Sequence, residues 1–244
     1  MPQSRVRHLP KAVILNHSTM TVHSIDIVVS VDLGTTFTGV SWRTPRTPIQ
    51  VINDWPGSGD RAERKVPTAI VYNADGTLSS WGHMCADDDD GGGGQDEASG
   101  KLRREFFKIF IDSANLAAAQ TLSRAPKTVE GAQRFATDYL RQLYGHVKET
   151  IEMQTGRRQV PGGWSDLVVV FLFSVPTTWT RMETINTFKG IIRKAGFGVE
   201  GPRHSAQVDL TEAEAAAVAT LKTSAIPHIC GHILSARVQA TKAY

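Results

Sequence analysis

Residues Asp32 to Thr36 place a carboxylate, a glycine and two adjacent hydroxyls within one short stretch that follows the apolar segment from Ile25. Because Gly34 has no Cβ, backbone N–H groups at this point can approach a bulky anion closely, and Thr35 and Thr36 add two hydroxyls. Asp32 would repel a phosphate unless a cation intervened, so we interpret it as a Mg²⁺-side group. A phosphate-binding turn and an ordinary β-turn, which the same residue types favour, are both consistent with the stretch.

The segments around this turn predict the strands that would position it. An apolar strand precedes Asp32, and a second strand carrying Phe37, Val40 and Trp42 leaves the turn. Short strands are expected at 49–52, 66–72 and 77–81, with a turn at 73–76 before the last of them.

Residues 54–62 contain a GxGxxA pattern after a strand, as a dinucleotide-binding fingerprint would. No apolar helix follows the pattern, because charged residues lead directly to Pro67. We therefore reject the dinucleotide interpretation and expect a loop.

The helical part of the chain is clearest at 128–153, where apolar residues recur every three to four positions and Gly156 supplies a stop. Upstream, residues 101–112 hold a core-facing apolar set that encloses Lys108.

Downstream, the apolar run 166–173 predicts a strand covered on both faces. A capping box, Thr180-x-x-Glu183, then predicts a helix closed by Gly196. A short strand follows at 207–210, and a second capping box at Thr211 predicts a further helix.

Composition limits the classes of protein that the chain can belong to. The chain has 244 residues, of which 41% are hydrophobic and 21% charged, as in a globular protein with a sizeable core. Its net charge of +3 is not clustered on any helix, which argues against a nucleic-acid partner. The two cysteines, Cys85 and Cys230, have no CxxC partner, so we expect neither a zinc site nor a disulfide framework, and a reducing, cytoplasmic location. No apolar run approaches the roughly 20 residues of a membrane span.

Several segments are expected to lie outside the folded unit. Residues 1–24 are basic and contain no acid, which predicts a disordered arm, with a mitochondrial presequence as the alternative. An Asp/Gly run within 86–100 predicts a flexible loop, because a calcium loop needs spaced acids. In the tail, His228, Cys230 and His232 lack a fourth metal ligand.

The turn at Asp32 resembles the first phosphate loop of the actin-like ATPase superfamily, which includes seventy-kilodalton heat-shock chaperones, actin and sugar kinases. Two later motifs resemble the heat-shock family in particular. The turn Val175-Pro176-Thr177 precedes a helix that ends near Ala195-Gly196-Phe197, and the segment 212–217 is similar to that family's Glu-Pro-Thr-Ala-Ala-Ala. The resemblance covers about 25–221, and the segments 54–57 and 65–68 look like a divergent, fungal-type branch.

This resemblance implies a set of site residues. Asp32, Gly34, Thr35, Thr36 and Phe37 would bind ATP, with Asp32 and Glu212 holding Mg²⁺ through water. Glu212 would also orient the lytic water, although a carboxylate in a first helical turn is favoured by the helix dipole in any case. Lys108 would reach the γ-phosphate, and a surface lysine that covers apolar residues with its stem is the alternative.

The predicted fold is α/β: one actin-like ATPase (ribonuclease H-like) lobe, a mixed five-stranded sheet with flanking helices and an inserted subdomain at about 67–157. The family's second phosphate loop does not appear, so we interpret 222–244 as divergent sequence after a truncation. The predicted function is an ATP-binding module that is weak or inactive in hydrolysis. The alternative is a non-enzymatic fragment that binds a polypeptide partner through a bare lobe face. A membrane is not expected as a partner.

Overall fold

The computed structural model describes residues 25–89, 100–157, 161–211 and 213. Its larger sheet has the strand order β3-β2-β1-β8-β9, and a short strand, β4, pairs with β2 beside this path. The strands of this sheet are β1 (Ile27–Leu33), β2 (Phe37–Arg43), β3 (Gln50–Val51), β4 (Val66–Pro67), β8 (Val169–Val175) and β9 (His204–Thr211).

Strand directions in this sheet are mixed. β2 runs antiparallel to β1 and to β3, whereas β1, β8 and β9 are parallel to one another. The chain enters the sheet through a hairpin and then adds parallel strands through helical crossovers, in the order that was predicted. The strand order and directions confirm the predicted α/β fold class with a mixed sheet, and β4 is a sixth strand beyond the five expected.

A second, antiparallel sheet has the order β6-β5-β7 and lies within the range predicted for an inserted subdomain. Its strands are β5 (Ile70–Tyr72), β6 (Leu78–Trp81) and β7 (Leu102–Arg104). Three short 3₁₀ helices accompany it: η1 (Gly82–Asp89), η2 (Ile109–Ile111) and η3 (Ser113–Thr121). The strand expected at 66–72 is therefore divided between the two sheets as β4 and β5.

The longest helix, α1 (Val129–Thr155), begins and ends where the sequence predicts. The Thr128 side chain accepts a hydrogen bond from the Gly131 N–H at the N-terminus. Gly156 adopts the left-handed conformation at the C-terminus, with φ of 68°. Both ends are therefore fixed by residues that satisfy otherwise unpaired backbone groups.

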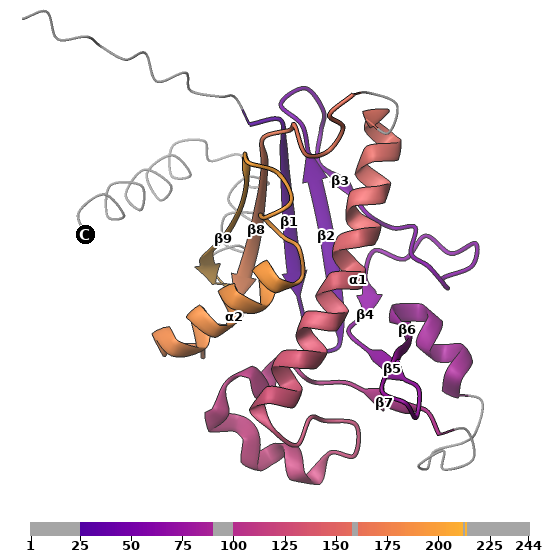
Figure 1. Cartoon of the computed structure of the whole chain (residues 1–244), viewed down its shortest axis with the longest axis vertical. Coiled ribbons are helices and arrows are strands. Elements are labelled where there is room, and N and C mark those ends of the chain that lie inside the picture. Colours follow the sequence, from indigo (N-terminus) through magenta and orange to yellow (C-terminus); the bar gives the residue numbers. More distant parts are fainter. Residues whose placement is uncertain (1–24, 90–99, 158–160, 212, 214–244) are drawn as a thin grey trace, which may run out of the picture.

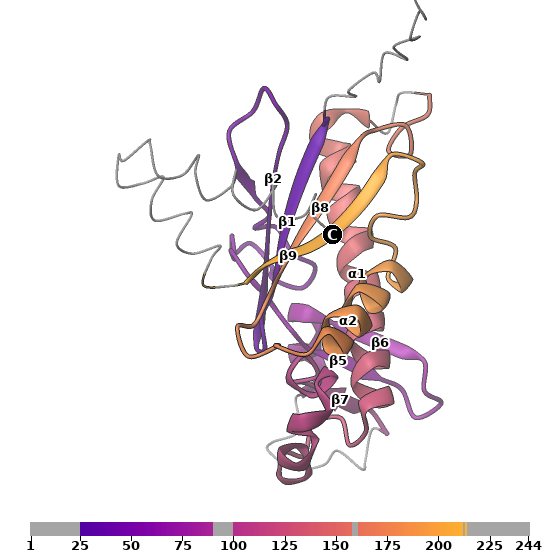
Figure 2. The same cartoon turned by 90° about the vertical axis from the view of Figure 1, so that its left-hand side faces the viewer.

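α1 also joins the two sheets. Its first half packs on the small sheet, where Phe135 contacts Tyr72 and Tyr139 contacts Trp81. Its second half packs on the larger sheet, where Tyr144 contacts Phe171 of β8. Figures 1 and 2 show α1 extending along the larger sheet and down to β5, β6 and β7.

The second helix, α2 (Met182–Lys194), covers the same face of the larger sheet as α1 (Figure 2). Its predicted capping box is wrong, because the N-cap position is Arg181 and no side chain caps the helix. The Thr180 N–H instead donates to the carbonyl of Thr178, which places Thr180 in the preceding turn.

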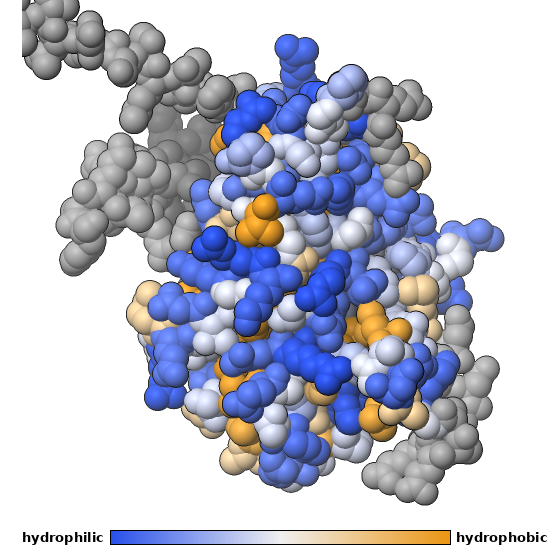
Figure 3. Space-filling view, in the orientation of Figure 1, coloured by the Kyte–Doolittle hydropathy of each residue, from blue (hydrophilic) through white to orange (hydrophobic). Residues whose placement is uncertain are grey.

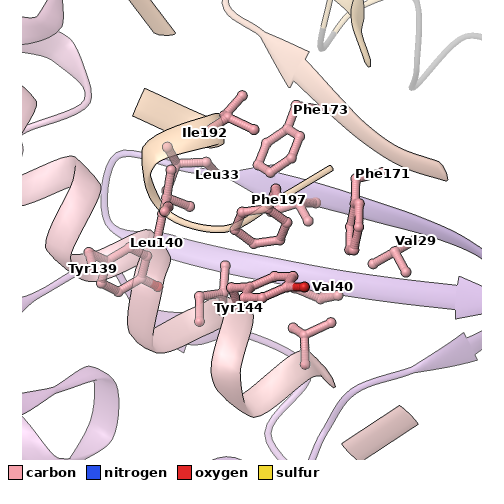
Figure 4. Packing of buried hydrophobic residues seen from close by; sticks show 14 of the residues in the cluster. Val29, Leu33, Val40, Tyr139, Leu140, Tyr144, Phe171, Phe173, Ile192 and Phe197 are labelled. Atoms are coloured by element: carbon pink, nitrogen blue, oxygen red, sulfur yellow. The ribbon is translucent and has the colours of Figure 1, made fainter. Parts of the chain in front are cut away.

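The core lies between these helices and the larger sheet (Figure 4). Phe171 and Phe173 of β8 are fully buried against Phe197 in edge-to-face contacts. Alternate residues of β8 are only partly buried, so the strand does not have the two fully covered faces that its continuous apolar run predicts.

Several predicted segments lie outside the described residues: the arm 1–24, most of the Asp/Gly loop at 86–100, and the tail 222–244 with its histidines and cysteine. The beginning of the loop range is helical, since η1 continues to Asp89. Of the helices described, none is both long and apolar enough to cross a membrane. The face seen in Figure 3 is mainly hydrophilic, with separate apolar patches.

Candidate functional site

The turn between β1 and β2 consists of Gly34, Thr35 and Thr36. A Cβ on Gly34 would lie 2.2 Å from the carbonyl oxygen of Phe37, a distance that no real contact allows. The geometry of the turn therefore requires glycine at this position, whether or not an anion binds there.

Backbone N–H groups at the turn are available to a ligand. Within the part of the chain that the structure describes, the N–H groups of Gly34, Thr35 and Thr36 donate to no backbone carbonyl. The Thr36 carbonyl accepts a 2.8 Å hydrogen bond from the Thr68 N–H, and the hydroxyls of Thr38 and Thr68 are 2.8 Å apart in a buried pair. Thr68 thus anchors the turn from the segment between β4 and β5.

A pocket with a volume of about 360 Å³ opens beside this turn. Three separate segments of the chain form it: the end of β1 with its turn, the η2–η3 region, and the loop between β8 and α2. The lining residues are Asp32, Gly34, Thr35, Lys108, Ile109, Asn115, Pro176, Thr178 and Trp179. Its volume is near the lower end of the range for small-molecule sites, and its lining is polar.

Lys108 lines this pocket from a buried position. The residue is only 2% exposed, so the alternative of a surface lysine is wrong. It is the N-cap residue of η2. Phe107 before it and Phe110 after it in the sequence are both buried. An ammonium group in such a low-dielectric setting interacts strongly with an anion.

Asp32 also lines the pocket, and its carboxylate is already paired. Lys65 Nζ lies 3.0 Å from Asp32 Oδ2, and about half of each side chain is exposed. Sequence reasoning did not anticipate this ion pair, because the two residues are 33 positions apart and only the pairing of β4 with β2 brings them together.

The remaining predicted site residues have different outcomes. Of the described residues, those lining the pocket do not include Thr36 and Phe37, and Phe37 is 49% exposed. Glu212 lies outside the described residues. Its neighbour Thr211 ends β9 and pairs with Val175, directly before Pro176 of the pocket.

Five further pocket residues were missed as site candidates: Ile109, Asn115, Pro176, Thr178 and Trp179. Thr178 and Trp179 follow the Val175-Pro176 turn on which the family resemblance rests. Their position directly after the end of β8 could have marked them as pocket residues. Asn115 comes from η3, and no motif marks it in the sequence. Its side-chain amide donates to the carbonyl of Ile109 and so ties η3 to η2 at the pocket wall.

The donor set fits a phosphate group better than a protein-built metal cage. Among the residues described, no cluster of three or more His, Cys, Asp or Glu side chains is present. Mg²⁺ nevertheless often binds through one or two carboxylates together with phosphate oxygens and waters. Asp32 fits that arrangement, and Lys108 with the turn N–H groups fits the phosphate oxygens.

A second polar cluster lies away from the pocket, beside β9. The Tyr144 hydroxyl donates to Glu200 at 2.6 Å, Lys148 pairs with the same carboxylate, and His204 Nε2 donates to the Trp164 carbonyl at 3.0 Å. Burial lowers the pKa of His204 below its usual value, and its Nδ1 has no hydrogen-bond partner within the described residues. Burial and the bond to Glu200 together raise the pKa of Tyr144. This packed cluster is a structural feature of the fold.

Solved structures with a similar fold include MreB5 of Spiroplasma citri bound to ADP, with 18% identity and a TM-score of 0.38. The same protein bound to AMPPNP has 18% sequence identity and a TM-score of 0.36. Each of these two matches covers 80% of this chain and 40% of the MreB5 chain. A non-polymerising mutant of MamK bound to AMPPNP has 12% sequence identity and a TM-score of 0.34. This match covers 76% of this chain and 41% of the MamK chain. The chain thus spans about 40% of the length of these structures. No protein-family model and no curated protein matches it.

Proposed function

We propose that this chain is an ATP-binding module of a heat-shock-chaperone-like protein. The observation that carries the proposal is the buried Lys108, which lines the same pocket as Gly34 and Thr35 although it is more than 70 positions away in the sequence. A buried lysine beside a turn with available N–H groups is an arrangement that suits a phosphate chain. The chaperone assignment rests on the sequence motifs around Val175-Pro176 and 212–217.

Four residues of the pocket have assigned roles in the proposed complex. The N–H groups of Gly34 and Thr35 donate to phosphate oxygens, and Lys108 neutralises their charge from the buried side. Asp32 faces the Mg²⁺ side of the phosphates, and the ion supplies further charge neutralisation when it is bound. The small volume of the pocket suits the phosphate end of the nucleotide.

We expect hydrolysis to be weak or absent in this chain. Phosphoryl transfer depends on positioning and on charge stabilisation around the whole phosphoryl group. Of the described pocket residues, Asp32 is the single carboxylate. Glu212 remains our candidate for orienting the lytic water, on the family resemblance alone.

The alternative function is a module that binds a polypeptide without catalysis. It is favoured by exposed apolar side chains at one edge of the larger sheet, where Ile49 is 64% and Val51 48% exposed. β3 is the terminal strand of that edge, and such strands pair readily with an added peptide strand.

Binding of ATP with Mg²⁺, measured by isothermal titration calorimetry, tests the proposal. Lys108→Met should weaken binding by about tenfold to a hundredfold, the range expected for losing a charged hydrogen bond. Lys194→Met is the matched control, because Lys194 is exposed in the last turn of α2. Equal affinities for the wild type and the folded Lys108→Met variant would contradict the proposal.

A second pair of variants uses the turn itself. Thr35 lines the pocket, whereas its neighbour Thr36 is not among the described lining residues. Thr35→Val should weaken ATP binding by about tenfold or more, because the hydroxyl can no longer donate a hydrogen bond to a charged phosphate oxygen, and Thr36→Val should leave it unchanged.

A further inference from the structure

The ion pair between Lys65 and Asp32 occupies the carboxylate that a divalent cation at the pocket would need. Lys65 Nζ contacts Oδ2 of Asp32 at 3.0 Å. Lys65 itself is not among the described residues that line the pocket, so it reaches Asp32 from outside. A cation entering with a ligand would meet a carboxylate whose charge is already balanced.

Gly39 provides the path by which Lys65 reaches Asp32. In the antiparallel pairing of β1 with β2, Gly39 is the residue directly opposite Asp32. A Cβ on Gly39 would lie 3.6 Å from both Cγ and Cε of Lys65. The lysine stem therefore passes over β2 within van der Waals distance of the point where a Cβ on Gly39 would stand.

The backbone of Lys65 is held in place on the other side. Lys65 directly precedes β4, whose residues Val66 and Pro67 pair with Thr38 and Phe37 of β2. The carbonyl of Lys65 also accepts a 3.2 Å hydrogen bond from His83 Nε2. The ion pair is thus part of a built arrangement of β1, β2 and β4.

We propose that Lys65 is a displaceable counter-ion of Asp32 that competes with a divalent cation and so sets the metal affinity of the pocket. The proposal deepens the proposed function, because it rests on Asp32 being the metal-side group. An ammonium bound to a carboxylate neutralises the attraction for Mg²⁺ and repels the ion. An ion pair in which both partners are about half exposed is weak, so a divalent cation can displace Lys65 without unfolding the chain.

A Mn²⁺ titration of the full chain without nucleotide tests the proposal. Mn²⁺ broadens the amide NMR signals of Gly34, Thr35 and Thr36 when it binds nearby, which makes weak binding measurable. Lys65→Met removes the charge and keeps most of the stem, and it should raise the Mn²⁺ affinity by about two- to fivefold. Lys65→Arg retains a cation and should leave the affinity close to that of the wild type.

Three further variants make the result specific. Arg64→Met removes the same charge from the neighbouring residue, for which no ion pair is found among the described residues, and should have little effect. Gly39→Val puts a branched side chain beneath the lysine stem and should reproduce the effect of Lys65→Met. Asp32→Asn, combined with Lys65→Met, should abolish the broadening.

Unchanged or weaker Mn²⁺ binding in Lys65→Met would overturn the proposal, as would an equal gain in Arg64→Met. Broadening that is absent in every variant would overturn it too, because Asp32 would then bind no cation even when freed. Calorimetry with ATP separates this inference from the proposed function. If no ATP binds but the Mn²⁺ pattern holds, the proposed function fails and the role of Lys65 stands.

Discussion

At the scale of single residues, Gly34 shows how a functional motif and a structural requirement can coincide. Its missing Cβ suits an anion, but the Phe37 carbonyl oxygen already occupies the space that a Cβ would take. We expect Gly34→Ala to lower the free energy of unfolding by about 1–3 kcal/mol, the cost typical of an overpacked site. Urea denaturation followed by circular dichroism measures this effect.

Gly39→Ala is the matched control for that measurement. A Cβ at Gly39 meets nothing closer than 3.6 Å, so its free energy of unfolding should differ from the wild type by no more than about 0.5 kcal/mol. An equal loss in both variants would contradict the steric explanation. Because Gly34 is needed by the turn, a Gly34 variant with weak ATP binding would say little about phosphate contacts, and the Thr35 and Lys108 variants are the sharper tests.

His204 gives the fold a specific dependence on pH. Burial lowers the pKa of His204 in the folded chain, although the hydrogen bond to the Trp164 carbonyl and the charge of Glu200 act in the opposite direction. The unfolded chain, with a histidine pKa of about 6.5, therefore binds a proton more readily than the folded chain does. The contribution of His204 to stability is complete above that pH and is lost as the pH falls toward the lower folded-state value.

The urea midpoint of the wild type should therefore decrease between pH 7.5 and pH 5.5, and His204→Gln should reduce that decrease. The glutamine amide can retain the donor to the Trp164 carbonyl. Some decrease should remain in the variant, because burial also lowers the pKa of His146, whose Nε2 donates to the Asp54 carbonyl. A wild-type midpoint that rises on acidification in this range would show that the assigned direction is wrong.

At the scale of elements, the sequence predicted those whose signals are local. The C-terminal end of α1 was predicted because Gly156 satisfies backbone groups within one turn of itself, and the start near 128 followed from the apolar periodicity. The same reasoning failed at Thr180, where a hydrogen bond to Thr178 keeps the residue in a turn and α2 begins two residues later. A sequence motif alone cannot show whether a residue will cap a helix when hydrogen bonds in the preceding loop determine where that helix begins.

The division of the segment 66–72 into two strands depends on partners that are distant in the sequence. Thr68 turns away from the strand because its N–H donates to the Thr36 carbonyl and its hydroxyl bonds with that of Thr38. The burial of Lys108 has the same kind of cause, since its surroundings form only when η2 packs against α1 and the pocket loops. Asp32, Gly34 and Thr35 of the hairpin could thus be predicted from the turn itself, and Lys108 only through the family resemblance. Asn115, Thr178 and Trp179, which tertiary packing brings to the pocket, were not predicted as site residues.

At the scale of the whole molecule, the two sheets share one hydrophobic core. Ile70, Tyr72 and Trp81 of the small sheet belong to the same buried cluster as the strands of the larger sheet. Two hydrogen bonds reinforce the connection through α1: the Tyr72 hydroxyl donates to Asp138 at 2.7 Å, and Arg134 donates to the Gly76 carbonyl at 3.0 Å. The small sheet is therefore expected to unfold together with the larger one.

Coincident unfolding curves are the measurable consequence. The amide NMR signals of β5 and β6 report on the small sheet, and far-ultraviolet circular dichroism reports on the whole chain. We expect both signals to change at the same temperature.

If ATP binds as proposed, a concentration of 100 times its Kd should add about 2.7 kcal/mol of stability to both transitions equally, because the pocket joins the β1–β2 turn, η2 and the loop after β8. Lys108→Met should remove most of this addition, and an early, separate transition of the β5 and β6 amide signals would mean that the small sheet folds on its own.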